Sequence, residues 1–222
     1  MTEAPVSNKL KSDKKRNSSE TKQFNHPFVH LVNNGKVGEF CAHCMRRPSP
    51  GNVNLHDANS LAASTNGDND HENKNQLKTG RLYMCGACRF ARYCGRPCQR
   101  AAWHSHHRAE CARLQRCYPN MPLTEALFMA RVVSKAHSLK PDDITQRDRP
   151  WSALMSHADD IKQDDRKMAQ FEKVYTKTRQ FINDDSEMPS REEFLEYFGR
   201  VWVNSHSVST MTGEEVGYAL DL

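Results

Sequence analysis

The sequence has no long hydrophobic run. Of its 222 residues only 37% are hydrophobic and 27% are charged, and no stretch approaches the ~20 consecutive apolar residues of a transmembrane helix. Residues 1–22 are polar and rich in lysine, so they lack the apolar centre of a secretory signal. So few apolar side chains favour a metal-organised module with a helical segment over one large core. We expect an intracellular protein of the nucleus or cytoplasm, without membrane association.

Acidic residues are nearly absent from one part of the chain. Residues 78–116 contain nine lysines and arginines but a single acid, Glu110. Such a basic surface suits nucleic acid or an acidic partner. Alternatively, the arginines are ordinary surface residues of a small cysteine-rich module that has little core. We favour this second interpretation of the basic segment. Nonspecific nucleic-acid binding stays an alternative, carried by Arg89, Arg92, Arg96, Arg100, Arg108, Arg113 and Arg116.

Two segments contain almost nothing to bury. Residues 1–25, rich in Lys, Ser and Asn, predict a disordered basic arm, in which Lys14-Lys15-Arg16 is a weak nuclear signal. Residues 49–79 are dominated by Asn, Ser, Asp and Gly, which predicts a flexible insert. Between them, residues 26–40 contain two short apolar runs separated by Asn-Asn-Gly and predict a lead-in hairpin.

The sequence after Cys117 has helical periodicity. We expect helices over residues 124–138, after Pro150 and over 165–182. A fourth follows Ser190, which begins a capping-box motif with Glu193. Residues 123–206 are therefore a helical segment, and residues 207–222 contain short strands. The apolar stripes predict core, including Trp151, Leu154, Met155, Ala158, Ile161, Phe171, Phe194, Phe198 and Trp202.

Eight cysteines in a reducing compartment favour metal ligands over disulfides, although disulfide pairing is a minor alternative. Seven of them lie at close spacings with one histidine, and only Cys117 is left over. A Cys-x2-Cys turn presents two sulfurs to one zinc ion, and eight ligands complete two closed, structural tetrahedra. The predicted ligands are Cys41, Cys44, Cys85, Cys88, Cys94, Cys98, His107 and Cys111.

This string, with Tyr93 before the fifth cysteine and Gln99-x3-Trp103 after the sixth, resembles a MYND finger spanning residues 41–111. The resemblance implies two cross-braced zinc sites, one formed by Cys41, Cys44, Cys94 and Cys98 and the other by Cys85, Cys88, His107 and Cys111. The number of residues that the family has between the sixth cysteine and the histidine selects His106. The number that it has between the histidine and the last cysteine selects His107. We prefer His107, because only it shares a helical face with Cys111.

The stretches HPFVH before the finger, and FLEYFGRVWVNSHSVST and EEVGYALDL after the helical segment, are similar to the SET-and-MYND (SMYD) lysine methyltransferases. That resemblance implies an all-α insert of the SET domain and methyl transfer from S-adenosylmethionine. Asn204 matches a cofactor-touching asparagine of the family. The family's Asn-His-Ser-Cys core has no counterpart, and residues 1–25 lack the glycines of its cofactor loop. We therefore expect a shortened relative that does not bind S-adenosylmethionine or catalyse alone.

The expected function is a protein-interaction module. The resemblance to MYND fingers implies that Gln99 and Trp103 contact proline-containing peptide segments of other proteins, chromatin proteins among them. An aromatic platform suits proline, and an amide suits peptide backbone. Equally, Trp103 could be a core residue that packs the last helix against the knuckle. The overall expectation is a small two-zinc MYND finger joined to an all-α segment, with a disordered arm and internal loop.

Overall fold

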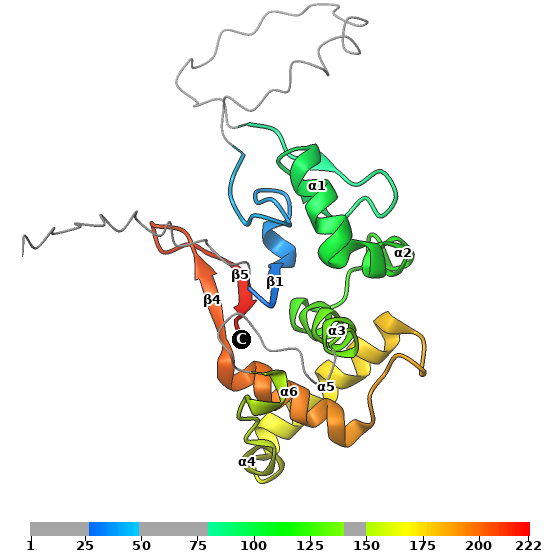
Figure 1. The fold of residues 1–222 in the computed structure, drawn as a ribbon, viewed down its shortest axis with the longest axis vertical. Helices are drawn as coiled ribbons and strands as arrows, with labels where there is room; N and C mark the ends of the chain where they lie inside the picture. Colours follow the sequence, from blue (N-terminus) through cyan, green and yellow to red (C-terminus); the bar gives the residue numbers. More distant parts are fainter. Residues whose placement is uncertain (1–26, 49–79, 140–149) are drawn as a thin grey trace, which may run out of the picture.

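The computed structural model describes residues 27–48, 80–139 and 150–222 (Figure 1). The predicted arm 1–25 and insert 49–79 lie outside these residues. The finger and the remaining elements follow one another along the chain as β1 (Val29–Val32), the 3-10 turn η1 (Asn34–Lys36), β2 (Tyr83–Met84), β3 (Arg92–Tyr93), α1 (Arg96–Ala102), the π-helix η3 (Trp103–His107), α2 (Arg108–Cys117), α3 (Thr124–His137), the 3-10 turn η4 (Trp151–Ala153), α4 (Ala158–Lys162), α5 (Asp165–Ile182), α6 (Arg191–Asn204), β4 (Ser205–Ser209) and β5 (Glu215–Leu220).

A three-stranded antiparallel sheet joins the two ends of the described chain, in the order β1-β5-β4. The central strand β5 pairs with both neighbours, and Gly217 lies opposite Val32 on one side and Val208 on the other. A Cβ at Gly217 would lie 2.0 Å from the carbonyl oxygen of Leu31. The close approach of β1 therefore requires glycine at this position.

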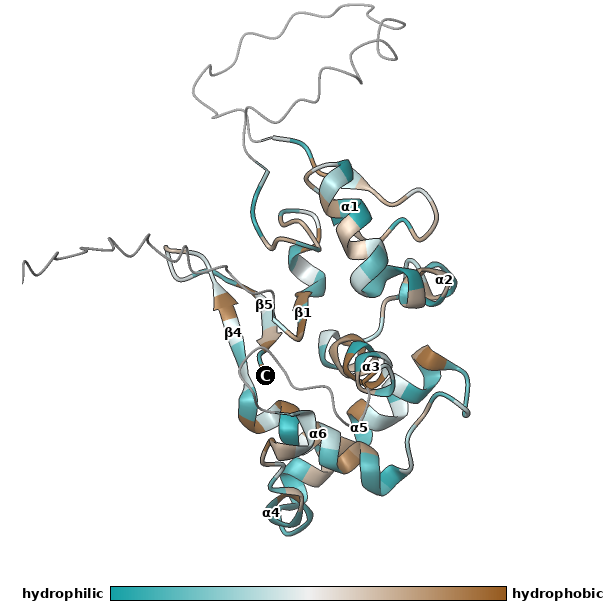
Figure 2. Ribbon diagram, in the orientation of Figure 1, coloured by the Kyte–Doolittle hydropathy of each residue, from teal (hydrophilic) through white to brown (hydrophobic). Residues whose placement is uncertain are grey.

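The helical part packs α3, α5 and α6 together beside the sheet (Figure 1). Figure 2 shows hydrophobic residues on β1 and along α3, α5 and α6, and their largest fully buried side chains include Phe171 and Phe194. Thr178 of α5 donates a hydrogen bond to the carbonyl oxygen of Ala126 on α3, at 3.3 Å. Ser190 caps α6 by accepting from the backbone N–H of Glu193 at 3.1 Å, as the capping-box motif predicts.

Two expected elements differ in the structure. Residues 27–40 do not form a hairpin, because β1 pairs with the distant β5 and the Asn-Asn-Gly segment begins a 3-10 turn. The helix expected after Pro150 is divided into η4 and α4, because Leu154 is extended and His157 adopts a left-handed conformation with φ of 49°. Met155 and Trp202, both expected in the core, are exposed. Apolar spacing alone does not distinguish these local breaks and surface positions.

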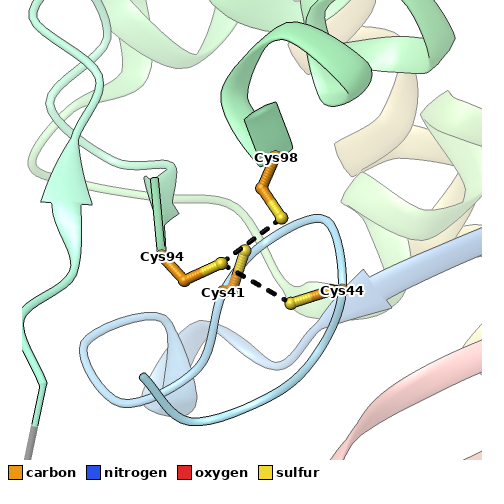
Figure 3. Close-up of side chains that lie close together, drawn as sticks. All are labelled: Cys41, Cys44, Cys94 and Cys98. Carbon is orange, nitrogen blue, oxygen red and sulfur yellow. Dashed lines mark hydrogen bonds between the residues drawn. The ribbon is translucent and has the colours of Figure 1, made fainter. Parts of the chain in front are cut away.

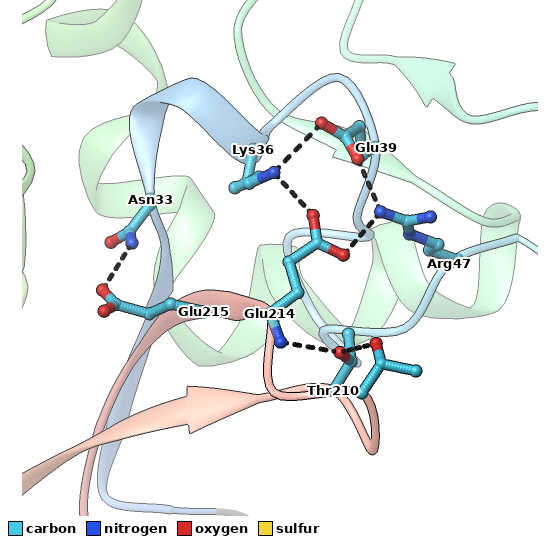
Figure 4. Close-up of polar contacts among 8 residues, drawn as sticks. Asn33, Lys36, Glu39, Arg47, Thr210, Glu214 and Glu215 are labelled. Atoms are coloured by element: carbon cyan, nitrogen blue, oxygen red, sulfur yellow. Dashed lines mark hydrogen bonds and ion pairs between the residues drawn. The ribbon is translucent and has the colours of Figure 1, made fainter.

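A polar network fixes the entry to the finger against the turn between β4 and β5 (Figure 4). Glu214 in that turn accepts from Lys36 at 2.6 Å and from Arg47 at 2.7 Å. Arg47 also pairs with Glu39 at 2.7 Å. Because these side chains are partly exposed, each pair contributes little by itself, about 0–1 kcal/mol. Together they define where the segment leading into Cys41 lies on the sheet.

None of the helices in residues 27–48, 80–139 and 150–222 combines the length and apolar character of a membrane span.

Candidate metal centre

The two Cys-x2-Cys motifs fold into equivalent turns. In the first, the backbone N–H of Met45 donates to the carbonyl oxygen of Cys41 at 2.9 Å, and in the second Arg89 donates to Cys85 at 3.0 Å. Met45 and Arg89 each follow the second cysteine and adopt left-handed conformations, with φ of 54° and 58°. This shared turn lets each motif direct two sulfurs to the same side, as a zinc knuckle requires.

The first cluster joins the first knuckle to the start of α1. It contains Cys41, Cys44, Cys94 and Cys98, whose sulfurs all lie within 4.8 Å of one another (Figure 3). The sulfur of Cys94 lies 3.8 Å from that of Cys44 and 3.3 Å from that of Cys98. Zn–S bonds of about 2.3 Å in a tetrahedron place sulfurs about 3.8 Å apart. The donor set and its spacing therefore fit one zinc ion.

The second cluster joins the second knuckle to η3 and α2. Its members are Cys85, Cys88, His107 and Cys111, all buried. The sulfurs of Cys85 and Cys111 are 3.8 Å apart, and Nε2 of His107 lies 3.8 Å from the sulfur of Cys88 and 3.4 Å from that of Cys85. Three sulfurs and one imidazole nitrogen fit a second tetrahedral zinc ion.

Each cluster contains one thiol whose pKa is lowered. Contact with Cys44 lowers the pKa of the Cys41 thiol to about 4. Burial raises the pKa of Cys85, but the backbone of Cys88 and the His107 ring lower it to about 6. Burial lowers the pKa of His107, yet contacts with Cys88, Glu110 and Cys85 raise it to about 10. Burial raises the pKa of Cys98 and of Cys111 to about 12. Thiols and imidazolium must lose their protons to bind zinc, so metal binding at both clusters releases protons.

The ligands interleave along the chain. The first cluster takes the first, second, fifth and sixth ligands, and the second takes the third, fourth, seventh and eighth. The predicted cross-braced arrangement of two structural zinc sites is confirmed. Each site has four protein ligands and no open coordination position for substrate or water, which is the arrangement of structural zinc.

The structure places His107, and not His106, in the second cluster. The two rings point to different neighbours. His106 packs against the rings of His30 and His43, with centroids 5.5 and 6.4 Å away, and burial lowers its pKa to about 2. His104 is exposed. The structure therefore agrees with the preference for His107, which was expected to share a helical face with Cys111.

Glu110 lies behind His107 and was not among the predicted site residues. Its Oε1 is 3.5 Å from Nδ1 of His107, on the side of the ring opposite the sulfurs. A carboxylate at Nδ1 fixes the orientation of a metal-binding imidazole and makes it a stronger ligand. The three-residue spacing from His107, and its position as the only acid among residues 78–116, are sequence signals that could have identified it.

Arg131 of α3 completes this arrangement. Its Nη2 and Nε donate to the two carboxylate oxygens of Glu110 at 2.6 and 3.0 Å, and Nη1 donates to the carbonyl oxygen of His30 on β1. Arg131 and Glu110 are only 8% and 13% exposed. Burial alone would raise the pKa of Glu110, but the Arg131 guanidinium holds it well below its usual range. The second zinc site is thus connected directly to the helical part and the sheet.

The remaining predicted site residues are not members of either cluster. Gln99 and Trp103 occupy the outer side of α1 and the start of η3. The Trp103 ring lies edge-on to His107, with centroids 5.9 Å apart, and 42% of the residue is exposed. Asn204 ends α6, where its Nδ2 donates to the carbonyl oxygens of Arg200 and Met155 at 2.7 and 3.1 Å.

The two adjacent histidines give a matched test of the ligand set. We expect the His107→Gln variant to lose at least one of two zinc ions per chain, because the second cluster then lacks its fourth ligand. The His106→Gln variant should keep two. Metal content per chain, measured by elemental analysis after desalting into metal-free buffer, checks this. Equal zinc content in the two variants contradicts the assignment.

Glu110 gives a second test. The Glu110→Gln variant should bind its weaker zinc ion about 10- to 100-fold less tightly, since loss of the carboxylate leaves His107 poorly oriented. Zinc competition against a chromophoric chelator measures the change. The control is Glu187→Gln, which removes a carboxylate that pairs with Arg113 and is not in contact with His107, and it should leave zinc affinity unchanged. A parallel loss in both variants contradicts the role of Glu110.

The comparisons with known proteins agree with this geometry. The family model described as MYND finger matches residues 70–111. That range contains six of the eight ligands, and the structure brings Cys41 and Cys44 to them from outside it.

Curated relatives include two proteins named histone-lysine N-methyltransferase SMYD3, from Mus musculus and Homo sapiens, each 30% identical over 142 residues. The match covers 63% of this chain and 33% of each relative. Smyd1 of Mus musculus is 40% identical over 53 residues, 24% of this chain and 10% of the relative. The chain spans about a third of the length of the SMYD3 relatives. This protein therefore carries a two-zinc MYND finger in a segment that resembles the SET-and-MYND lysine methyltransferases.

Proposed function

We propose that the finger is a docking module that binds short proline-containing segments of other proteins. MYND domains are protein-interaction modules, which supports protein partners in general. The closed zinc sites are consistent with this, because a metal ion with four protein ligands holds structure and has no free position for a reacting group. The finer proposal concerns the chemistry of the partner and the residues that contact it.

The observation that carries the proposal is the position of Trp103. The Trp103 ring contacts the ring of His107, which belongs to a buried cluster. The rest of the residue faces outward, and 42% of it is exposed. Trp103 is therefore partly packed against the finger and partly exposed. A partly exposed indole provides an apolar face for proline rings. Gln99, one helical turn earlier, supplies an amide for the peptide backbone.

The test uses an acetylated and amidated decaproline peptide, which is uncharged, in isothermal titration calorimetry with the zinc-loaded chain. We expect saturable binding by the wild type and at least about a tenfold loss in the Trp103→Ala variant, as for an aromatic anchor of an interface. The matched control is Trp202→Ala, since Trp202 is also exposed, at 45%, but lies on α6.

Zinc content should remain at two ions per chain in both variants, which excludes an unfolded finger as the cause. Equal peptide binding by the wild type and Trp103→Ala contradicts the proposal, as does absence of binding by the wild type. An equal loss in Trp202→Ala assigns the effect to a different face.

A second candidate is a role in lysine methylation. It is supported by the similarity to proteins named histone-lysine N-methyltransferases and by Asn204, whose position matches a cofactor contact of that family. A single matching contact is too little for a binding site, so we propose that this 222-residue chain does not act as a methyltransferase alone.

Equilibrium dialysis of the chain against radiolabelled S-adenosylmethionine tests this second candidate. We expect no saturable binding at micromolar concentrations. Saturable binding that is lost in an Asn204→Ala variant would instead support an enzymatic role and contradict our proposal.

A further inference from the structure

The outer side of α1 combines aromatic, amide and cationic groups. Arg96, Gln99, Arg100 and Trp103 follow the spacing i, i+3, i+4 and i+7, so they lie on one helical face about 100° wide. The opposite side carries Cys98 of the first zinc cluster and the fully buried Ala102. The zinc site thereby fixes which side of the helix faces outward. We call the outward set the Trp103 face.

The positive charge on this face is not neutralised within the described finger. Arg96 and Arg100 are exposed and form no ion pair with any residue of 27–48, 80–139 and 150–222. Glu110 is the only acid among residues 80–116, and both of its oxygens are occupied by Arg131. Arg113 and Arg179 are paired with Glu187 and Asp185, whereas Arg89 and Arg108 of the finger are exposed and, like Arg96 and Arg100, form no ion pair within the described residues. Within the described residues, no acidic side chain neutralises these two arginines, and the neighbouring indole of Trp103 distinguishes this face from the other unpaired arginines of the finger.

We infer that the Trp103 face selects proline-containing segments that also carry aspartate or glutamate beside the proline. This inference rests on the proposed function and adds the charge of the partner to it. The indole receives the proline, while the guanidinium groups of Arg96 and Arg100, one turn apart from each other, attract carboxylates on the flanking residues. Arginine stays charged at all relevant pH values and forms bidentate bonds with carboxylates. Such flanking charges mainly accelerate association and select among partners.

An acidic peptide fits this face better than nucleic acid does. Binding of single strands uses several aromatic platforms on which successive bases stack, whereas Trp103 is the one largely exposed aromatic residue among the described residues 80–116. The glutamine adjacent to it suits a peptide backbone. Nucleic acid is therefore kept as an outcome of the test.

Three capped peptides provide the experiment, each titrated against the zinc-loaded chain. They are the neutral decaproline, the same peptide flanked by two aspartates at each end, and the same peptide flanked by two lysines. At 50 mM salt we expect the acidic peptide to bind about five- to tenfold more tightly than the neutral one, and the basic peptide more weakly than both. The advantage of the acidic peptide should shrink at 300 mM salt, where charges are screened over a few ångströms.

The double variant Arg96→Glu/Arg100→Glu should reverse the order of the charged peptides. The control variant Arg179→Glu/Arg191→Glu changes the net charge of the chain by the same amount, but on α5 and α6. It should keep the order in which the wild type binds the three peptides. Zinc content verifies that each variant retains its finger.

The outcomes separate the two proposals. If no peptide binds, the docking function itself fails. If all three bind equally, docking holds and charge selection is wrong. If acidic binding survives Trp103→Ala unchanged, the arginines act without the indole and the combined face is wrong. If a 20-nucleotide single strand displaces the acidic peptide at 150 mM salt with higher affinity than the peptide, nucleic acid is the better ligand and the inference is overturned.

Discussion

Coordination of two zinc ions by interleaved ligands is the constraint on which this structure depends. The ligands come from two knuckles, the start of α1 and the segment from η3 to α2, and β2 and β3 between them are two residues long. So short a hairpin is not stable alone. Apparent binding energies of about 10–16 kcal/mol for each structural zinc ion exceed what so small an apolar core supplies. The cross-brace also means that neither knuckle can move independently of α1 or α2.

The contact between the finger and the helical part is polar at its centre. Arg131 is an arginine in an otherwise apolar, buried side of α3, and it holds Glu110, which in turn contacts His107. A buried ion pair is favourable only when both partners are fully hydrogen-bonded, and here the guanidinium also donates to the backbone of β1. The orientation of a zinc ligand is thereby linked to the packing of α3 and the sheet. Arg131 and Glu110 thereby connect the finger to α3 and β1.

The same constraint determines what the finger offers to partners. Because Cys98 points into the first cluster, Arg96, Gln99, Arg100 and Trp103 point out. The only acid of residues 80–116 is turned inward toward Arg131, which leaves the outer face of α1 positively charged. The orientation of α1 therefore determines both that Cys98 reaches the first zinc cluster and that the arginines face outward. Proline-containing acidic segments are the partner class that we propose for this surface.

The zinc ligands could be predicted from sequence because tetrahedral coordination demands closely spaced cysteines, and few other constraints produce such spacing. Helices α3, α5 and α6 could be predicted for a similar local reason, the three- and four-residue period of their apolar side chains. The failures were nonlocal or conformational. The partner of β1 is β5, which is distant in sequence, and the helix expected after Pro150 is interrupted by the left-handed His157.

The sequence by itself therefore determined the metal-binding chemistry, the type of finger and the main helices, since these depend on residue type and short spacing. Only the tertiary structure decided that Glu110 and Arg131 support His107, and that Trp103 is exposed. It also decided that β1 closes a sheet with β5. Each of these depends on contacts between segments far apart in the chain, which local spacing does not specify.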